Sequence, residues 1–385
     1  MMKNKPVKRL MVFFLILVII TTTGCSPTAD KRKFDSLAIV LGVGIDYDST
    51  KDNVLFTTQI VKTEEFEGGN RFFNITAAGK NMLEAVDNAD NVANRVLYVA
   101  HNQIVVIGKS AAENGLFGYL DYFFRDDEAR YDVGMVMTEM EAWEILERAT
   151  NLGSIPSQEI TVLLENQVAM SSCAKLELLQ FAMESNSCFQ SSVMPIIGIS
   201  QEDPDTDKVQ FEVTGSGVFN GGKLIYTMNR EETRGFLWGT GKIQKGEIML
   251  PGVNVDILSG GTKFKVRVEG DRDKRLVLEF DVDVEGNLGE IVSQVEQNTD
   301  ELKDINKACR ELIRQQLSHV VQQALENNCD IFGASNYLFK HEYKKWKQIE
   351  GNWQELYKNA ALEINVKANI LRTGSLIEPI FGSEK

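Results

Sequence analysis

The sequence predicts an α+β protein in which mixed sheets pack against helices. Strand patterns and amphipathic helical patterns alternate up to about residue 200. From residue 209 to residue 283 the pattern is mostly that of strands, and a long amphipathic helix and one last alternating strand follow. Because helices and strands alternate in one part and segregate in the other, we expect more than one domain.

The first part of the chain is predicted to be one α/β domain over residues 34–200. Residues 37–45 are almost continuously apolar and end at Asp46, which is typical of a strand buried on both faces. Apolar residues recur at helical spacing over 82–97, and Ser110 is placed to cap a further helix. The other expected elements are strands over 54–61, 72–77, 103–107, 131–137 and 193–199, and helices over 139–149 and 159–184.

A small β-rich middle domain is expected over residues 201–260. Residues 201–208 contain the run Asp-Pro-Asp, which is typical of a linker. Strand patterns over 209–218 and 223–226 flank Asn220-Gly221-Gly222, a strong hairpin signal.

The remaining residues are predicted to form a C-terminal α+β domain over 261–375 and a tail over 376–385. Two runs alternate charged and apolar residues, and a turn centred on Asp273 would pair them as a hairpin. In that register the solvent-side pairs are Arg267 with Glu279, Lys265 with Asp281 and Lys263 with Asp283, and Val266 faces Phe280 inside. A helix over 302–325 with one apolar stripe and a strand over 364–370 complete this domain.

The N-terminus has the features of an export signal over residues 1–24. Four basic residues precede an apolar run over 10–20, which is shorter than the roughly 20 residues that a membrane-spanning helix needs. Small residues then precede Cys25, and this arrangement resembles the lipobox of bacterial lipoproteins. The resemblance implies that the Cys25 thiol becomes thioether-linked to diacylglycerol and that cleavage makes it the first residue. The alternative is an ordinary secretory signal followed by a chance cysteine.

Cys25 is therefore the expected lipidation site, and residues 25–33 the expected tether. Each buried methylene contributes about 0.8 kcal/mol, so two or more acyl chains, palmitate among them, make the attachment durable. Lys31, Arg32 and Lys33 lie where anionic headgroups would be, or else form a solvated spacer.

Charge excludes nucleic acid as an expected partner. The chain has 41 Lys and Arg and 55 Asp and Glu, a net charge of −14. The signal contains four of the basic residues and none of the acidic ones, which leaves 37 against 55, or −18. Phosphate binding needs a basic footprint, and an acidic body stands off an anionic membrane.

The other cysteines are expected to be buried thiols. Cys309 falls on the apolar stripe of the long helix and lies too far from Cys329 for a disulfide. Cys173 and Cys188 form the one pair that we would test as a disulfide.

Three partial motifs for nucleotide or metal binding lack residues that the binding requires. Gly42 and Gly44 follow the spacing of a dinucleotide-binding turn, but the third glycine is absent. Gly239-Thr240-Gly241-Lys242 lacks the upstream glycine and the Ser or Thr of a phosphate loop. Asp281, Asp283 and Glu285 resemble a calcium loop whose twelfth position is a valine. We therefore expect no catalytic residue, no cofactor and no metal site.

Several segments together resemble the spore germination receptor C-subunit lipoproteins of the Ger(x)C type. Residues 37–46 are similar to the opening of that family, 100–103 to its helix-to-strand histidine segment, and 124–130 to its acidic, arginine-bearing turn. Cys329-Asp330-Ile331-Phe332-Gly333, then Trp346, Trp353 and Arg372-Thr373-Gly374, resemble its C-terminal signature. Ser26 and Pro27 depart from the Trp and Asp that commonly follow the family's lipidated cysteine.

Most of these residues have a structural explanation. The ring nitrogens of His101 are expected to satisfy backbone groups, and Arg125 and Arg130 to pair with Asp126, Asp127 or Glu128. Trp346 and Trp353 lie on one helical stripe, which is more often core than a ligand platform. Gly374 is expected to supply a special backbone conformation.

The resemblance implies a non-enzymatic receptor subunit, lipid-anchored on the outer face of the spore inner membrane. It implies A-type and B-type integral membrane partners, with which the chain would sense germinants and trigger germination. It also implies several mixed domains in an extended arrangement. The alternative is a lipid-anchored extracytoplasmic solute-binding protein, which needs a cleft between two lobes. A third possibility, an anchored hydrolase, lacks nucleophile and metal motifs.

Overall fold

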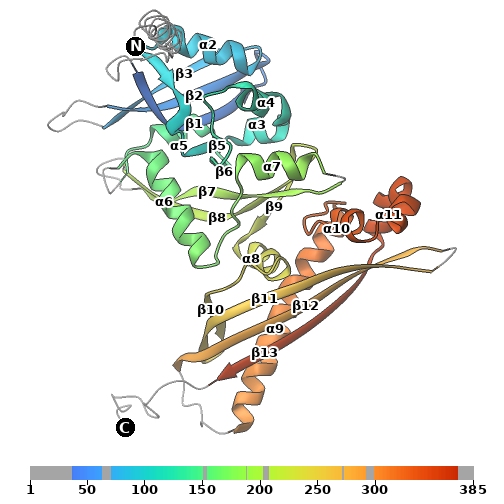
Figure 1. The fold of residues 1–385 in the computed structure, drawn as a ribbon. Helices are drawn as coiled ribbons and strands as arrows, with labels where there is room; N and C mark the ends of the chain where they lie inside the picture. Colours follow the sequence, from blue (N-terminus) through green and yellow to red (C-terminus); the bar gives the residue numbers. More distant parts are fainter. Residues whose placement is uncertain are drawn as a thin grey trace, which may run out of the picture. The chain divides into compact units, whose positions relative to one another are not determined.

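The computed structural model describes residues 37–62, 71–150, 154–187, 189–202, 208–270, 273–291 and 299–371 (Figure 1). The description below concerns the compact unit over residues 38–385, together with Leu37 at the start of its first strand. The residues of its hydrophobic clusters run from Ala38 to Ile370. Cys25, the tether, Cys188 and Arg372-Thr373-Gly374 lie outside the described residues.

Nine strands form the first sheet in the described part of the chain. They are β1 (Leu37–Asp48), β2 (Asn53–Val61), β3 (Phe72–Gly79), β4 (Val96–Tyr98), β5 (Ile104–Ile107), β6 (Gly134–Thr138), β7 (Ser192–Glu202), β8 (Val209–Asn220) and β9 (Lys223–Asn229). The order is β3-β2-β1-β5-β6-β7-β8-β9, and β4 pairs with β1. The central β1, β5, β6 and β7 are parallel, whereas both flanks are antiparallel.

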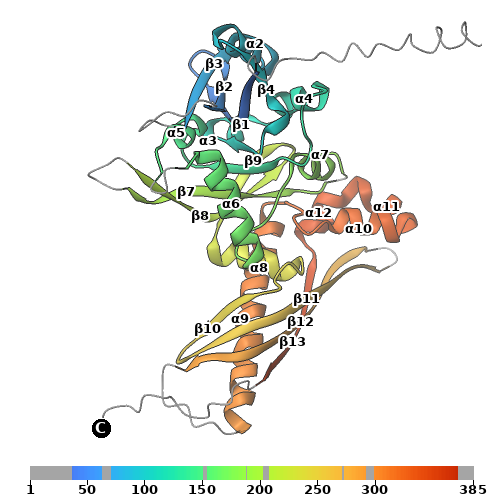
Figure 2. The ribbon, with the colours of Figure 1, turned by 60° about the vertical axis from the view of Figure 1, so that its left-hand side comes forward.

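Helices cover both faces of this sheet (Figure 2). Side chains alternate between the faces, so Val105 and Ile107 of β5 enter one core cluster and Ile104 and Val106 enter another. The first cluster includes residues of α2 (Met82–Val92), α3 (Lys109–Asn114), α4 (Phe117–Arg125) and α7 (Leu178–Ser185). The second includes residues of α5 (Ala142–Glu147) and α6 (Pro156–Ala169).

Two predicted helices are shorter in the structure, and a third is divided. The helix expected over 82–97 ends at Val92, because residues 96–98 pair with β1 as a strand. The helix expected over 139–149 forms only from Ala142 to Glu147. The helix expected over 159–184 is two helices, since Ser171 adopts a left-handed φ of 54° and ends the first of them.

Residues 201–260, where a small middle domain is expected, form no sheet of their own in the described part of the chain; their strands are divided between two sheets. β7 and β8 pair antiparallel up to Glu202 and Val209, and the expected linker therefore joins neighbouring strands of one sheet. Residues 209–229 belong to the first sheet, whereas residues from 246 onward belong to the second. Each strand belongs to the sheet whose strands it pairs with. Local composition does not specify these distant partners.

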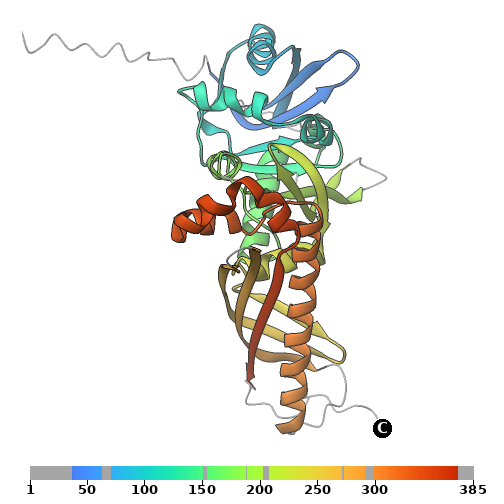
Figure 3. The same ribbon diagram turned by 90° about the vertical axis from the view of Figure 1, so that its right-hand side faces the viewer.

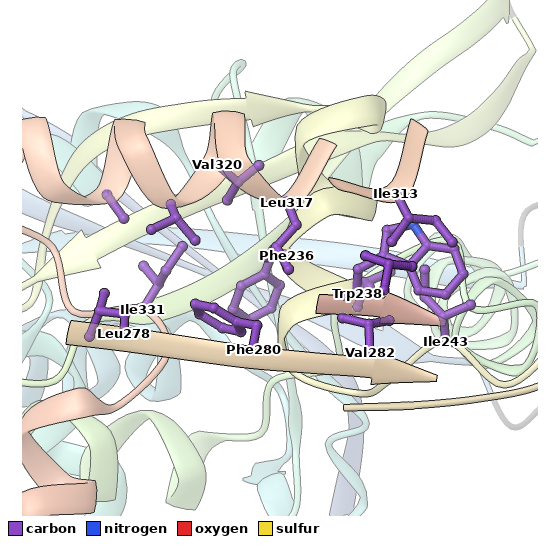
Figure 4. Close-up of a cluster of buried hydrophobic side chains, with 14 of the residues drawn as sticks. Phe236, Trp238, Ile243, Leu278, Phe280, Val282, Ile313, Leu317, Val320 and Ile331 are labelled. Carbon is purple, nitrogen blue, oxygen red and sulfur yellow. The ribbon is translucent and has the colours of Figure 1, made fainter. Parts of the chain in front are cut away.

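The second sheet has the order β10-β11-β12-β13. Its strands are β10 (Gly246–Leu250), β11 (Val253–Glu269), β12 (Arg275–Ile291) and β13 (Ala361–Leu371), and β13 runs parallel to β12. One face packs against α8 (Arg230–Gly239) and α9 (Thr299–Glu326). Figure 4 shows side chains of α9 above Leu278, Phe280 and Val282 of β12, with Phe236 and Trp238 of α8 between them.

The β11–β12 hairpin forms as predicted, but its register differs by two residues. Lys263 lies opposite Asp281, Lys265 opposite Glu279, and Val266 opposite Leu278. The last pair is Glu269 with Arg275. The same faces remain inside and outside because a shift of two residues preserves the alternation.

Short helices complete the described C-terminal part. They are α10 (Ala334–His341), α11 (Tyr343–Ile349), the 3-10 helix η3 (Glu350–Asn352) and α12 (Trp353–Lys358). Their buried side chains, including Leu338, Trp346 and Trp353, enter the same cluster as α9 and the second sheet. The predicted α+β class, mixed sheets packed with helices, is confirmed.

Candidate functional site

The glycines of the two incomplete nucleotide motifs have structural roles. A Cβ at Gly42 would lie 2.4 Å from Cβ of Ser157, and one at Gly44 would lie 3.1 Å from Cβ of Ala142. Both glycines thus let α5 and α6 approach β1. Gly241 has a φ of 65° and donates its N–H to the Trp238 carbonyl, which ends α8 in a left-handed cap.

Asp46 lies at the end of β1 and holds the start of α5. Its carboxylate accepts hydrogen bonds from the backbone N–H of Ala142 at 2.6 Å and of Trp143 at 3.1 Å. A Cβ at Gly108 would lie only 1.8 Å from Oδ1 of Asp46, so that position admits only glycine. Burial raises the pKa of Asp46 to about 8, and the neighbouring Glu141 adds to the shift.

Ser110 connects this corner rather than capping a helix, contrary to the prediction. Its Oγ accepts the backbone N–H of Tyr47 at 2.9 Å and donates to Glu141 at 2.7 Å. The N-cap of α3 is Gly108, which makes no side-chain cap. The ends of β1 and β5 and the start of α5 are therefore tied by short polar contacts.

The histidine segment and the arginine turn differ from the predicted pairings. His101 is exposed at the end of the 3-10 helix η2 (Val99–His101), and its ring packs edge-on against Tyr98. Arg125 pairs with Asp121 and Arg130 with Asp132, each at 2.6 Å.

Helical spacing explains the partner of Arg125, since Asp121 lies one turn earlier on α4. The hydrogen bonds from Arg125 and Arg130 hold the pKa of Asp121 and Asp132 below the ordinary value. Asp126 instead shapes the turn, because its carboxylate accepts the backbone N–H of Glu128 at 2.9 Å. All four members of the ion pairs are exposed, so they contribute little to stability.

Asp330 of the C-terminal signature caps α10 from a buried position. Its carboxylate accepts hydrogen bonds from Ala334 N, Ser335 N and Ser335 Oγ, each at 2.7 Å. Burial raises the pKa of this carboxyl, and the three donors oppose that shift. Gly333 adopts a φ of 72°, which turns the chain into the helix.

The same turn holds a segment that leads into the first sheet. Gln190 forms a β-bridge with Asp330, and Ser191 N donates to the Asp330 carbonyl at 3.0 Å. Oε1 of Gln190 also accepts from Asn336 Nδ2 at 3.2 Å. Asp330 therefore binds α10 through its side chain and the segment before β7 through its backbone.

Aromatic rings close around this contact. Phe189, with a left-handed φ of 62°, lies 6.2 Å from Trp346 and 6.5 Å from Trp353 between ring centroids. The two tryptophans are 5.2 Å apart and almost fully buried, which confirms their predicted core role, but they lie on two helices, α11 and α12, and not on one helical stripe. We call Phe189, Gln190, Asp330, Trp346 and Trp353 the joint, because they connect the two sheets.

Further contacts tie α8, which the sequence prediction missed, to α9. Asn229 and Glu232 form a capping box at the start of α8, and this Asn-x-x-Glu pattern was a usable signal. A Cβ at Gly235 would lie 2.5 Å from the Gln316 carbonyl oxygen, so the two helices touch closely. Glu232 also accepts from Gln323 at 2.8 Å.

The cysteines of the described chain are inert thiols. Cys173, Cys309 and Cys329 are buried and free, as predicted for buried thiols. Burial raises the pKa of Cys173 to about 12 and that of Cys309 and Cys329 to about 11. Among the described residues there is no group of three or more His, Cys, Asp or Glu that could hold a metal ion.

Two of the pockets in the described part of the chain border the first sheet. The larger, about 520 Å³, is bounded by α6, β8 and α8, and the smaller, about 320 Å³, lies between α6 and the starts of β5 and β6. In the larger pocket Arg230 pairs with Glu212 and donates to the Val213 carbonyl, and Arg234 donates to the Glu247 carbonyl. Among the described residues, every helix is too short or too polar to span a bilayer.

Two family models match the chain. The model described as spore germination protein N-terminal domain matches residues 30–199, and the model described as spore germination B3/GerAC like, C-terminal, matches residues 214–374. Together they span most of the chain.

Similar proteins of Bacillus subtilis (strain 168) include spore germination protein KC, 27% identical over 97% of this chain and 98% of its own length. Spore germination protein YndF is 24% identical over 97% and 99%. A solved structure of the GerBC protein covers 86% of this chain and 97% of its own, with a TM-score of 0.56 and 19% identity, which shows the same fold. The chain therefore belongs to the GerAC-like family of spore germination proteins, the C-subunit family of germinant receptors.

Proposed function

We propose that this chain is the lipid-anchored C subunit of a spore germinant receptor. It acts without catalysis, beside A-type and B-type integral membrane subunits, on the outer face of the spore inner membrane. The match of both family models along the chain carries the proposal. The export signal and Cys25 support the anchor.

The geometry supports a structural role for the residues that carry the family resemblance. Asp46 and Asp330 are buried carboxyl groups that each fix the start of a short helix. Trp346 and Trp353 pack around Phe189 instead of lining an open pocket.

Lipidation would act by confinement. An anchored chain moves in two dimensions beside its membrane partners, which raises its effective concentration without any new contact. The body does not need high affinity for those partners under this scheme.

The test of the anchor is Cys25→Ala in the native chain, with Cys173→Ala as the matched control. Loss of the Cys25 thiol should leave the body folded but reduce both membrane retention and the germination response to nutrients. Cys173 is buried within the body, so its replacement should keep the protein in the membrane fraction. Normal retention and response in Cys25→Ala would contradict the proposed role of the anchor.

The test of the partners is affinity isolation of the tagged chain from spore membranes. Two multispanning proteins, encoded by neighbouring reading frames, should be recovered with it. Isolation of the chain alone under conditions that preserve membrane complexes would count against the receptor assembly.

The pocket of about 520 Å³ is the observation that favours the alternative, a lipid-anchored extracytoplasmic solute-binding protein. Isothermal titration of residues 30–385 with a panel of amino acids and sugars separates the two functions. The receptor-subunit proposal expects no micromolar binding in this pocket. Micromolar binding that Arg234→Gln abolishes would favour the alternative.

A further inference from the structure

Helices α10 and α11 carry a basic and aromatic surface on an acidic protein. Between residues 339 and 348 there are four lysines and one glutamate, a net charge of +3 with His341 neutral, whereas the whole chain carries −14. The exposed side chains of this surface, which we call the basic patch, are Phe339, Lys340, His341, Tyr343, Lys344, Lys345 and Lys347. Figure 3 shows these red-orange helices reaching away from the second sheet.

Packing on the inner side of the two helices fixes the outward direction of the patch. Leu338 of α10 and Trp346 and Ile349 of α11 are buried in the core cluster of the second sheet. Because these residues face inward, the lysines on the opposite side cannot turn into the body.

Two lysines of the basic patch form ion pairs within the described part of the protein, and two do not. Lys345 pairs with Glu342, and Lys347 lies 3.0 Å from Glu350. Within the part of the chain that the structure describes, Lys340 and Lys344 have no carboxylate partner. Their charge is therefore not balanced at short range.

Exposed aromatic rings accompany these charges. Phe339 is 44% exposed and Tyr343 is 50% exposed, and their rings meet edge-on at 5.6 Å. The Lys347 ammonium lies 5.7 Å from the centre of the Tyr343 ring. Lysines beside exposed aromatics are the combination that binds the headgroup region of an anionic bilayer, where rings enter the interface and ammonium groups meet phosphates.

We propose that the basic patch docks onto anionic phospholipid headgroups and forms a membrane contact independent of Cys25. The acidic remainder of the body is repelled by the same surface, so the patch also sets which side faces the lipid. Each lysine near an anionic surface strengthens binding about fivefold, or about 1 kcal/mol. Lys340 and Lys344 together should therefore strengthen binding to the anionic surface about 30-fold.

The test uses residues 30–385, which contain all the described core clusters and lack Cys25. Sedimentation with vesicles measures its partition between water and lipid. The body should bind vesicles with about one-third phosphatidylglycerol and not vesicles of phosphatidylcholine alone. Binding should fall as salt approaches about 1 M, where the screening length shrinks to about 3 Å.

Two double variants locate the contact. Lys340→Gln with Lys344→Gln should weaken partitioning into anionic vesicles about 30-fold. The matched control, Lys109→Gln with Lys223→Gln, removes two exposed lysines of the first sheet's helices and strands and should change binding by less than about twofold. Phe339→Ser with Tyr343→Ser should also weaken binding, and circular dichroism checks that every variant is folded.

Three results would overturn the proposal. Equal binding to neutral and anionic vesicles would remove the role of the headgroup charge, and equal loss in both lysine variants would remove the role of this surface. Absence of vesicle binding, with Lys340 and Lys344 still needed to recover receptor subunits from spore membranes, would assign the patch to an acidic protein partner instead. Because the tested body has no Cys25, none of these results depends on the lipid anchor.

Discussion

Replacement of Asp330 by alanine tests the joint most sharply. The change removes the hydrogen bonds that the Asp330 carboxyl accepts from the buried N–H of Ala334 and from the N–H and hydroxyl of Ser335. An unpaired buried donor costs about 1–3 kcal/mol, and loss of a helix cap costs about 1 kcal/mol. Because alanine also removes the cost of burying a charged group, part of this loss is offset, and we expect about 2–4 kcal/mol of destabilisation.

The assay is denaturant unfolding of residues 30–385, followed by tryptophan fluorescence, to which Trp346 and Trp353 contribute directly. Asp330→Asn keeps one acceptor and should give an intermediate loss. Asp304→Ala removes an exposed carboxylate of α9 and should stay within about 0.5 kcal/mol of the wild type. If Asp330→Ala is as stable as this control, the cap does not hold the joint and the reasoning is refuted.

Three further predictions concern packing, pH and the thiols. Gly235→Ala should cost about 1–3 kcal/mol of stability because its Cβ meets the Gln316 carbonyl, whereas Gly118→Ala on α4 meets no atom and should be neutral or stabilising in the same unfolding assay. Asp46 keeps a proton up to about pH 8 in the folded state and only to about pH 4 when unfolded, so stability should fall as pH rises through this window, by at most about 1.4 kcal/mol per unit. Unfolding titrations across that range should show the slope in the wild type and a flatter one in Asp46→Asn. The Cys309 thiol should resist alkylation at neutral pH until the protein is unfolded, and rapid labelling of the folded chain would contradict its burial.

Local periodicity predicted which faces would be buried. Phe280 and Val282 point into the core as expected, and Ile305, Cys309 and Ile313 form the buried stripe of α9. These features depend on the order of polar and apolar residues within one element, which the sequence states directly.

Register and sheet membership required more than periodicity. A shift of two residues keeps Val266 and Phe280 inside, so the alternation could not distinguish the predicted pairing from the observed one. The turn decides it, since Gly270 leaves the ladder at a φ of 79° directly after Glu269. The division of residues 201–260 between two sheets likewise depends on pairing with strands far away in the sequence.

The partners of the signature residues were only partly predictable. The run from Asp330 to Ser335 contains the elements of a helix cap, and a local search for caps finds it. The contact with Phe189 and Gln190 joins residues more than a hundred positions apart, and nothing in the local pattern indicates it.

Mass spectrometry of the N-terminal peptide of the chain isolated from spore membranes tests the central claim most directly. A lipid-anchored receptor subunit should begin at Cys25 and carry a diacylglyceryl group on that sulfur. A mature chain that begins elsewhere, or an unmodified Cys25 thiol, would contradict it.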